Sequence, residues 1–410
     1  MRWSTVAVIL LAFVVRVGVQ FAVLDSLETD PDGYRGIAEN LVRTGTLGHD
    51  TRPSAFRAPL YPLLISPCVA LGEWATTAIA AVHVVIGVLT VWAVMRLALM
   101  WGLGNWSLVA GLLVAVDPLL VHQSTQVMTE TLAALLAVFS LWSATVAQQR
   151  PTGASAFAAG IWACLAALCR PTFIPWVVIV GWRLGREASD TRRRQSILGA
   201  LALAIAVTLG VWIARNQWRL GSPIVGTTHG GYTLLLGNNP EFYAFLRGGG
   251  WRTTWDSADF NRRFIDEHAI DSPADEIRVD REAYREAWQH IRDDPAAFAL
   301  SSIWRVGSMW DPLPHALSPR EPLHTRLLRY TIGGWNAVVL ILAVIGLLSS
   351  HDPHDAPHWR IGILMVLCVT AVHLLFWSTI RMRAPLVPVV AIFAAGGLRA
   401  CGRWLLEHKS

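Results

Sequence analysis

Apolar and polar residues alternate along this chain in long blocks rather than at single positions. Runs of mostly apolar residues, each near the length of a membrane-crossing helix, lie near 6–24, 76–98, 107–122, 130–148, 154–169, 172–184, 196–214, 329–349, 360–377 and 384–400. This pattern predicts an all-α polytopic membrane protein with about ten transmembrane helices. The first run is expected to be a retained span, since it carries no cleavage site of small residues.

Charge in the short connections predicts the orientation. The segment 183–195 contains Arg183, Arg186 and the run Arg192–Arg194, the densest basic cluster of any short loop. Because basic loops stay in the cytoplasm, we expect cytoplasmic loops near 96–106, 149–153, 183–195 and 350–360, with both termini on the same side. The segments 25–75 and 215–328 then face the exoplasmic side of the cell membrane.

Three regions follow from this topology. Residues 1–215 are expected to form an N-terminal transmembrane module with a first exoplasmic loop at 25–75 that contains interfacial helices. Residues 216–328 are expected to form an exoplasmic loop with amphipathic helices, in which Ser257 and Asp271 or Ser272 are helix caps and Arg305 marks a helix on the membrane surface. Residues 329–410 supply the last transmembrane helices and a cytoplasmic tail.

Composition supports a membrane location and excludes nucleic-acid binding. Hydrophobic residues make up 53% of the 410 residues and charged residues only 15%, well below the charged fraction of about a quarter in soluble domains. The net charge of +5 is distributed over short loops, so no soluble basic domain exists to hold a duplex. The bilayer is therefore the expected surroundings of most of the chain.

Carboxylates of the first exoplasmic loop are the first candidates for chemistry. Asp30 and Asp32 flank Pro31 and precede Gly33 and Tyr34, which places them in a turn before a short helix. One of the two could deprotonate a substrate hydroxyl, and the alternative is that they only cap the helix.

Charged and polar residues at the other predicted exoplasmic helix ends form a second group. Arginines on this side are disfavoured by the positive-inside rule, and their planar donors suit a phosphate. Each could instead only reach toward the headgroups. The candidates for phosphate binding are Arg57, Arg170, Arg215, Arg381 and Arg383, and those for other substrate contacts are Tyr34, Tyr61, Glu130, Asn216 and His229.

Short motifs in order along the chain resemble those of a known superfamily. The first loop reads Asp30-x-x-x-Tyr34, then Arg57-Ala-Pro-Leu-Tyr-Pro62, and it resembles that of the GT-C glycosyltransferases. The similar branch is the bacterial family 39-like one, related to protein O-mannosyltransferases and the aminoarabinose transferase of lipid A. Further similar motifs are Asp117-Pro118, Thr129-Glu-Thr-Leu132, Cys169-Arg-Pro171, Ala214-Arg-Asn216, Gly237-Asn-Asn-Pro240 and Arg381-Met-Arg-Ala-Pro385.

The resemblance implies the GT-C fold and an enzyme that moves a sugar, with inversion, from a polyprenyl-phosphate donor to an acceptor on the exoplasmic side. It implies Asp30 as the base, with Asp32 as the alternative base or a helper. The arginines would stabilise the departing phosphate, and the acceptor would be a lipid, a glycan or a protein.

One departure from that branch concerns a metal. The aminoarabinose branch has a Glu-Lys pair where this chain has Phe56-Arg57, and that glutamate helps to bind a metal. The cofactor is therefore unknown, with a divalent metal as an open alternative.

Two other functional classes fit parts of the pattern. A polytopic transporter or flippase of lipid-linked sugars would also have many spans, but such folds show repeated halves and broken helices near the midplane, which this sequence lacks. A non-catalytic GT-C-like subunit of an envelope glycan assembly complex is the other alternative.

Overall fold

A computed structural model of the chain describes residues 3–188, 190–250, 253–316, 321–349 and 356–407. Within these residues the protein is almost entirely helical, and a single small sheet pairs β1 (Gly48–His49) with β2 (Arg52–Pro53) in antiparallel register. The predicted loop at 350–360 lies largely outside the described residues. The expectation of an all-α protein is confirmed.

Helices occur at each of the ten predicted apolar runs. They are α1 (Trp3–Ala22), α4 (Ala75–Met100), α5 (Ser107–Ala115) with α6 (Pro118–Gln123), α7 (Glu130–Gln149), α8 (Gly153–Cys169), α9 (Ile174–Glu187), α10 (Thr191–Val207) with α11 (Leu209–Leu220), α17 (Leu323–Ser349), α18 (Ala356–Val372) and α19 (Val387–Glu407). Six described segments are long and apolar enough to cross a membrane, and several others are shorter. The protein is therefore a membrane protein with fewer full-length spans than predicted runs.

Local chemistry explains where several of these helices begin. The run at 107–122 is divided because the Asp117 carboxylate accepts a hydrogen bond from the Leu120 amide and begins α6 at Pro118. Thr152 and Ser155 form a capping box at the start of α8, which satisfies amide groups that a helix leaves free. The short 3₁₀ turns η3 (Gly104–Trp106) and η4 (Pro171–Phe173) precede α5 and α9.

Small residues allow two helices of the bundle to touch backbone to backbone. A Cβ atom added at Gly346 on α17 would lie 2.0 Å from the Phe393 carbonyl oxygen of α19, and one at Gly397 would lie 2.0 Å from that of Leu342. Only glycine fits at such a crossing, as is common between membrane helices. This contact fixes the position of α19, whose N-terminal end follows η6 (Ile380–Leu386).

The first loop folds against the end of the bundle. It contains η1 (Leu24–Glu28), α2 (Tyr34–Thr44), the β1–β2 hairpin, α3 (Leu60–Val69) and η2 (Gly72–Trp74). Gly33 has a φ of 75° directly before α2, a backbone conformation that side chains other than glycine's disfavour. The Asp30-Pro-Asp-Gly sequence thereby turns the chain sharply into α2.

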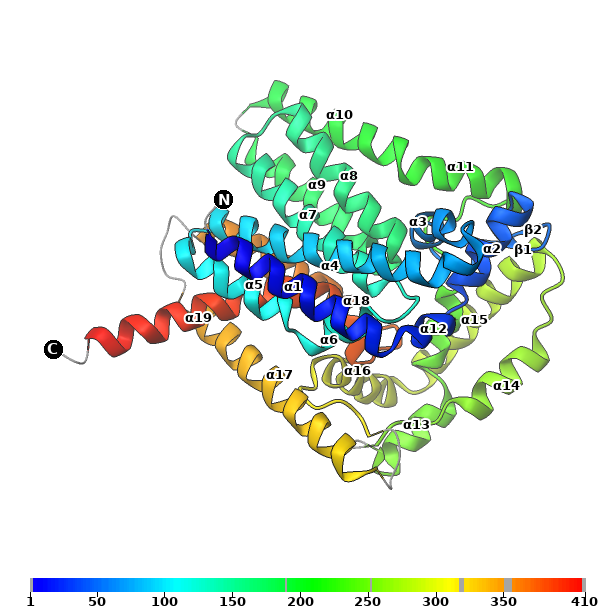
Figure 1. Cartoon of the computed structure of the whole chain (residues 1–410). Coiled ribbons are helices and arrows are strands. Elements are labelled where there is room, and N and C mark those ends of the chain that lie inside the picture. The colour runs from blue at the N-terminus through cyan, green and yellow to red at the C-terminus, as the bar shows by residue number, and fades with distance from the viewer. Residues whose placement is uncertain (1–2, 189, 251–252, 317–320, 350–355, 408–410) are drawn as a thin grey trace.

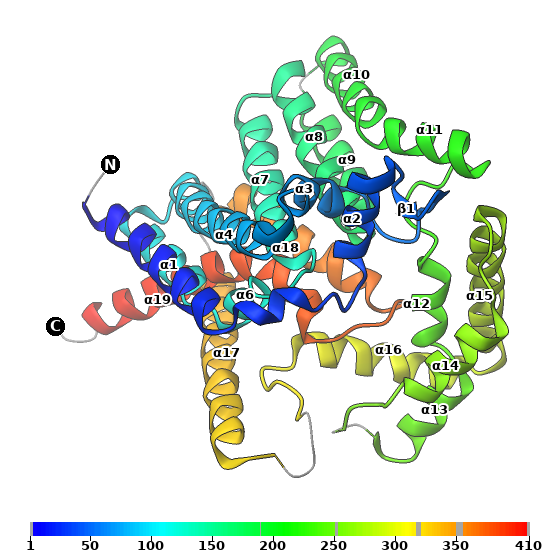
Figure 2. The same cartoon turned by 45° about the vertical axis from the view of Figure 1, so that its right-hand side comes forward.

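In its described residues the long second segment contains the α-helices α12 (Gly230–Leu236), α13 (Pro240–Arg247), α14 (Ala258–Glu267), α15 (Pro273–Asp293) and α16 (Pro295–Trp310). Ser272 caps α15 as predicted, since its hydroxyl accepts from the Asp275 amide at 3.2 Å. Ser257 stands at the start of α14 but makes no capping bond with its side chain. Figure 2 shows these helices together on one side of the molecule, beside α2 and α3.

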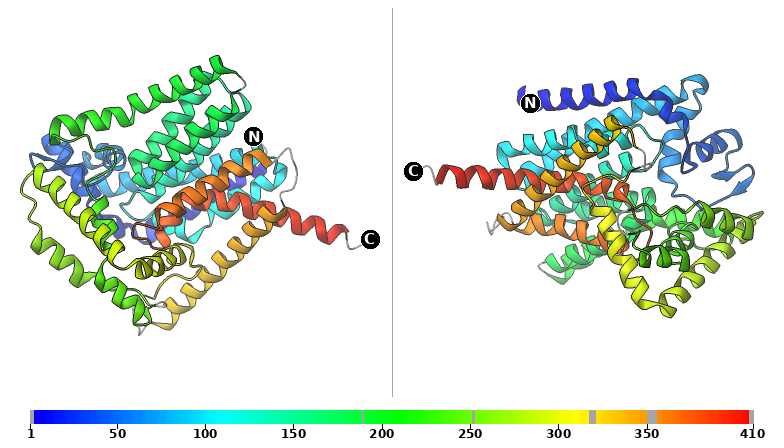
Figure 3. Two further views of the ribbon diagram at one scale, coloured as in Figure 1. Left: turned by 180° about the vertical axis from the view of Figure 1, so that it is seen from behind. Right: turned by 90° about the horizontal axis from the view of Figure 1, so that it is seen from below.

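The ends of the chain lie far from the first loop. Figure 1 shows both termini toward one end of the bundle, whereas α2, the hairpin and α12 lie toward the other, and Figure 3 agrees from two further directions. This arrangement is compatible with the predicted topology. The three-region division at 215/216 and 328/329 stays a prediction.

Arg305 on α16, where a helix on the membrane surface was predicted, points into the protein, and the position of α16 relative to the membrane stays a prediction. Its side chain is fully buried and donates to the carbonyl oxygens of Gly237 and Leu374 and to the Ser301 and Ser302 hydroxyls. Burial lowers the pKa of the Arg305 guanidinium to about 10. The arginine therefore joins α16 to the segment after α12 and to the end of α18 instead of reaching for headgroups.

Replacing this arginine is expected to destabilise the protein. Arg305→Met leaves several buried carbonyl and hydroxyl groups without a donor, which should cost about 2–4 kcal/mol of unfolding free energy. Thermal unfolding in detergent measures the effect, with Arg278→Met on exposed α15 as the control. Equal melting temperatures for the two variants would show that the Arg305 contacts contribute nothing.

Candidate active site

Helix ends and loops at the first-loop end of the bundle enclose a cavity of about 520 Å³. Its walls come from the turn before α2, the segment before α3, the start of α7, the turn after α8, the start of α12, the end of α18 and η6. The charged and polar side chains that line it include Asp32, Tyr34, Arg57, Thr129, Glu130, Arg170, His229, His373 and Arg381. Seven of the twelve residues proposed from the sequence are thus brought together here.

Asp32 is the carboxylate of the first loop that lines the cavity. It lies 2.9 Å from an Arg381 guanidinium nitrogen and 3.4 Å from one of Arg57. Burial would raise the pKa of the Asp32 carboxyl, but the positive charges of Arg381 and Arg57 outweigh burial and hold the pKa below its usual value. Asp32 is therefore ionised at neutral pH.

Glu130 begins α7 and is 1% exposed. Its carboxylate lies 2.8 Å from an Arg170 nitrogen and 3.6 Å from one of Arg381, and Arg170 also donates to the Thr129 hydroxyl at 3.2 Å. A buried carboxylate requires such partners. The pair fixes the turn after α8 against the start of α7.

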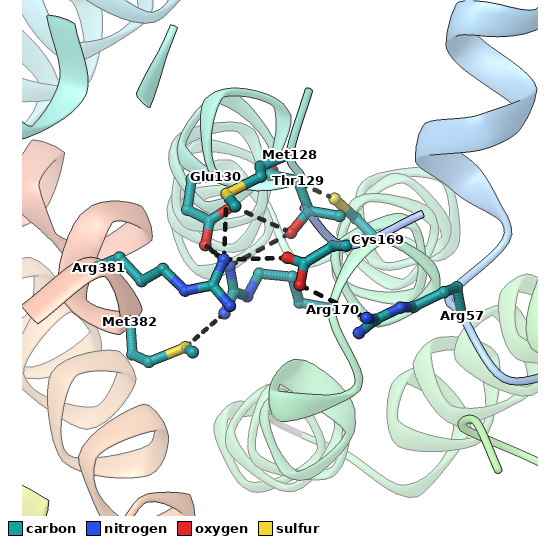
Figure 4. A network of polar contacts seen from close by, with 9 residues as sticks. Arg57, Met128, Thr129, Glu130, Cys169, Arg170, Arg381 and Met382 are labelled. Atoms are coloured by element: carbon teal, nitrogen blue, oxygen red, sulfur yellow. Dashed lines mark hydrogen bonds and ion pairs between the residues drawn. The ribbon is translucent and has the colours of Figure 1, made fainter. Parts of the chain in front are cut away.

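Arg381 connects the two carboxylates, because its guanidinium contacts both Asp32 and Glu130. Figure 4 shows Arg381 and Arg170 converging on Glu130, with the Met128 and Met382 sulfur atoms beside the guanidinium groups and Arg57 facing them from the opposite wall. Three guanidinium groups thus meet two carboxylates, which leaves one positive charge uncompensated within the cluster. An anion is the ligand that this cluster favours.

Arg57 has the weakest attachment within the cluster. Its one ion pair is the 3.4 Å contact with Asp32, and its guanidinium otherwise lies over the rings of Tyr34 and Phe56, 5.5 and 5.1 Å from their centroids. The rings hold the guanidinium in position by a cation–π interaction. Arg57 is therefore preorganised for a second anionic partner.

His229 and Tyr34 are neutral members of the cavity wall. Burial, with the nearby Arg57 charge, lowers the pKa of His229 to about 3, and the ring stacks between Phe56 and Tyr232 with centroid distances of 4.4 and 5.0 Å. Burial raises the pKa of Tyr34 to about 12. At neutral pH both side chains offer hydrogen bonds without charge.

Two candidates of the first loop lie outside the cavity lining. Asp30 accepts a hydrogen bond from the Gly36 amide at 2.9 Å, so it caps α2, as one of the two sequence interpretations allowed. Tyr61 is fully buried, and its hydroxyl lies 2.9 Å from His83 Nε2. The geometry gives both residues structural contacts.

Three further candidates also serve the fold. Arg215 donates to the carbonyl oxygens of Leu47 and Ser54 at 2.7 and 2.9 Å, and Asn216 donates to that of Ile224 at 2.9 Å. Arg383 donates to the Asp311 carbonyl oxygen at 2.6 Å. Each donates to backbone carbonyl groups outside the regular helices, and none lines the cavity.

Thr129 and His373 line the cavity but were not proposed from the sequence. Thr129 had a signal, because it precedes Glu130 in the quoted motif. His373 had none, since it is a single histidine within the predicted apolar run at 360–377, and only the folded structure brings it to the cavity.

A divalent metal fits these residues poorly. Among the described residues, no group of three or more His, Cys, Asp or Glu side chains is arranged to hold a metal ion. The cavity carboxylates Asp32 and Glu130 are each paired with arginine, and the phenyl ring of Phe56 cannot coordinate a metal. Arginine guanidinium groups thus already occupy the carboxylates that a metal would need.

Residues 56–213 match the model of the dolichyl-phosphate-mannose-protein mannosyltransferase family. No curated protein sequence matches the chain. The matched part includes Arg57, Glu130 and Arg170, and it ends before α12.

Solved structures of membrane glycosyltransferases are similar over nearly the whole chain. The Archaeoglobus fulgidus oligosaccharyltransferase, tethered to an acceptor peptide, matches with a TM-score of 0.50 at 12% identity, over 100% of this chain and 51% of its own. ArnT from Cupriavidus metallidurans, bound to undecaprenyl phosphate, matches with a TM-score of 0.44 at 15% identity, over 96% of this chain and 77% of its own. The chain spans about half the length of the archaeal enzyme.

Proposed function

We propose that this chain, a membrane protein with the GT-C glycosyltransferase fold, transfers a sugar from a polyprenyl-phosphate donor to an acceptor hydroxyl. The observation that carries the proposal is the cavity in which Arg57 and Arg381 contact the ionised Asp32 and Arg170 adds a third positive charge nearby. Such an arrangement supplies an anion site and a base a few ångströms apart. The match of residues 56–213 to a family named for a lipid-phosphate sugar donor supports it.

The donor phosphate would bind the arginine cluster. Arg170 and Arg57 are the first candidates, since Arg170 lines the inner wall and Arg57 has only one long contact with a carboxylate. Planar guanidinium groups pair well with phosphate oxygens. Positive charge at this point also stabilises the phosphate that departs.

The lipid chain of the donor would follow the apolar part of the cavity wall. This part of the lining includes Ile174 and Pro175 at the start of α9 and Leu375 and Phe376 after α18. A polyprenyl chain needs a path that excludes water and meets the bilayer. The space between the ends of α9 and α18 provides the apolar surface for it.

Asp32 is the proposed base, in place of Asp30. The acceptor hydroxyl would give its proton to the Asp32 carboxylate while its oxygen forms a bond to the anomeric carbon. The bond between that carbon and the phosphate oxygen breaks, and its electron pair leaves with the polyprenyl phosphate. Attack from the face opposite the phosphate inverts the configuration of the sugar.

The reaction would take place on the exoplasmic side. Both termini lie at the end of the bundle opposite the cavity, and the basic loop at 183–195 favours that end as cytoplasmic. The acceptor is a lipid, a glycan or a protein carrying a free hydroxyl.

Incubation of the purified protein with a panel of radiolabelled polyprenyl-phosphate sugars and a membrane extract tests this function. We expect one donor to be consumed, with equal release of polyprenyl phosphate and label in an acceptor. Movement of intact donor across vesicle membranes without bond cleavage would identify a flippase instead. The Arg262→Met variant, altered on exposed α14, is a suitable control for the purification.

A further inference from the structure

His373 is a buried polar side chain that the proposed chemistry does not yet use. It directly follows α18, is 2% exposed and lines the cavity. Neither ring nitrogen forms a hydrogen bond with any described residue. The Trp377 backbone lies close enough to act on the ring as a weak hydrogen-bond partner, although the contact falls outside ordinary hydrogen-bond geometry.

An imidazole without partners in this position is costly. A buried polar group that makes no hydrogen bond loses its hydration without compensation, and such groups in native proteins call for an explanation. Burial and the charge of Arg170 also lower the pKa of His373 to about 4. At neutral pH the ring therefore presents one N–H donor and one acceptor nitrogen.

The backbone around His373 is held in place from both sides. The Leu374 carbonyl oxygen accepts from the Ser302 hydroxyl at 2.7 Å, that of Leu375 accepts from the Asn238 side-chain amide at 2.9 Å, and the Trp377 backbone amide donates to the Thr233 carbonyl oxygen at 3.1 Å. These bonds tie the segment to α12 and α16. The ring is thus fixed at the cavity wall before any ligand arrives, which is how binding sites reduce the cost of ordering.

The neighbours of His373 indicate which ligand group it meets. Arg170, whose charge acts on the ring, is the first candidate for the donor phosphate. Leu375 and Phe376, which follow His373 closely along the chain, belong to the apolar part of the same cavity lining. A lipid phosphate likewise combines a charged head with an apolar chain.

We infer that His373 binds the phosphate of the polyprenyl donor, its ring N–H donating a hydrogen bond to a phosphate oxygen beside Arg170. This inference rests on the proposed function and names a further contact at the same site. The donor phosphate thereby receives a hydrogen bond from an uncharged ring, at a place where burying a further charged side chain would be costly.

Binding of undecaprenyl phosphate and of undecaprenol to the purified full chain in detergent tests this inference. His373→Phe should weaken binding of the phosphate on the order of tenfold or more, as expected for a hydrogen bond to a charged group, and leave binding of the alcohol unchanged. His373→Gln should recover part of the affinity, because its amide can donate the same bond. His122→Phe, at an exposed histidine outside the cavity lining, is the matched control.

Three results would contradict either the His373–phosphate contact or the proposed function. Equal affinity of wild type and His373→Phe for the phosphate would overturn the role of His373 and leave the proposed function standing. An effect seen only with a sugar-loaded donor would assign His373 to the sugar and overturn the phosphate contact. Wild-type protein that binds the alcohol as tightly as the phosphate would contradict the proposed function itself. Melting temperatures show whether each variant is folded. If His373→Phe does not fold, the affinity of His373→Gln for the phosphate, relative to wild type, tests the inference in its place.

Discussion

Asp32→Asn is expected to lower the rate of sugar transfer about a hundred- to ten-thousandfold, the range that a general base contributes. The amide keeps the size of the side chain but cannot take the proton of the acceptor hydroxyl. Donor affinity should change much less, because the arginines remain. Single-turnover transfer with saturating donor, together with the donor Kd, separates the two effects.

Asp30→Asn is the matched control for this prediction. Asp30 accepts one hydrogen bond from the Gly36 amide, and an asparagine carbonyl oxygen can accept the same bond. Near wild-type transfer is therefore expected. If Asp30→Asn were inactive and Asp32→Asn active, Asp30 would be the base, as the first-loop resemblance favours.

The pH dependence of transfer follows from the same carboxylate. The pKa of Asp32 is held below its usual value by Arg381 and Arg57, so the ionised form, and the stability that its ion pairs add, persists above the usual pKa of about 4. The ionised form of Asp32 and the stability from its ion pairs are lost only as pH falls through the lowered pKa of the folded state. Asp32 should therefore cause no loss of transfer between about pH 5 and 7.

Arg381→Met is the second change with a large expected effect. Asp32 would keep only its 3.4 Å contact with Arg57, whereas Glu130 would keep Arg170. The pKa of Asp32 should then rise, and the phosphate should lose a stabilising charge, which together lower kcat/KM about a hundredfold or more. Initial rates over a range of donor concentrations give this value.

Arg381→Lys and Arg262→Met complete the comparison. Lysine restores the charge but not the planar donors that contact two carboxylates, so only partial recovery is expected. Arg262 pairs with Asp259 on the exposed surface of α14, and its loss should not alter transfer. Wild-type kinetics for Arg381→Met would remove Arg381 from the account.

Much of the fold was predictable from the length and spacing of apolar runs. Burial of backbone groups in a bilayer permits little besides helices, so each run had to be helical, and the ordered motifs correctly identified the GT-C fold. Asp117 was harder to interpret, because one capping residue divides α5 from α6 while the run that contains both stays apolar overall. The contacts of Arg305 could not be predicted, because sequence alone does not reveal the carbonyl groups that surround it.

The candidate site was only partly predictable. Charges at helix ends pointed to Arg57, Glu130, Arg170 and Arg381, which do meet in one cavity. The same reasoning could not separate these residues from Arg215 and Arg383, since a guanidinium that binds loop carbonyls has the same sequence signal. Nor could it choose between Asp30 and Asp32, which differ only in the direction that the turn at Gly33 gives them.

The most direct measurement is a structure of the protein bound to a polyprenyl-phosphate donor analogue whose sugar cannot be transferred. We predict the phosphorus beside the Arg170 and Arg57 guanidinium groups, the lipid chain between the ends of α9 and α18, and the anomeric carbon facing Asp32. A phosphate bound at the opposite end of the bundle, with the cavity unchanged, would contradict the proposed glycosyltransferase site.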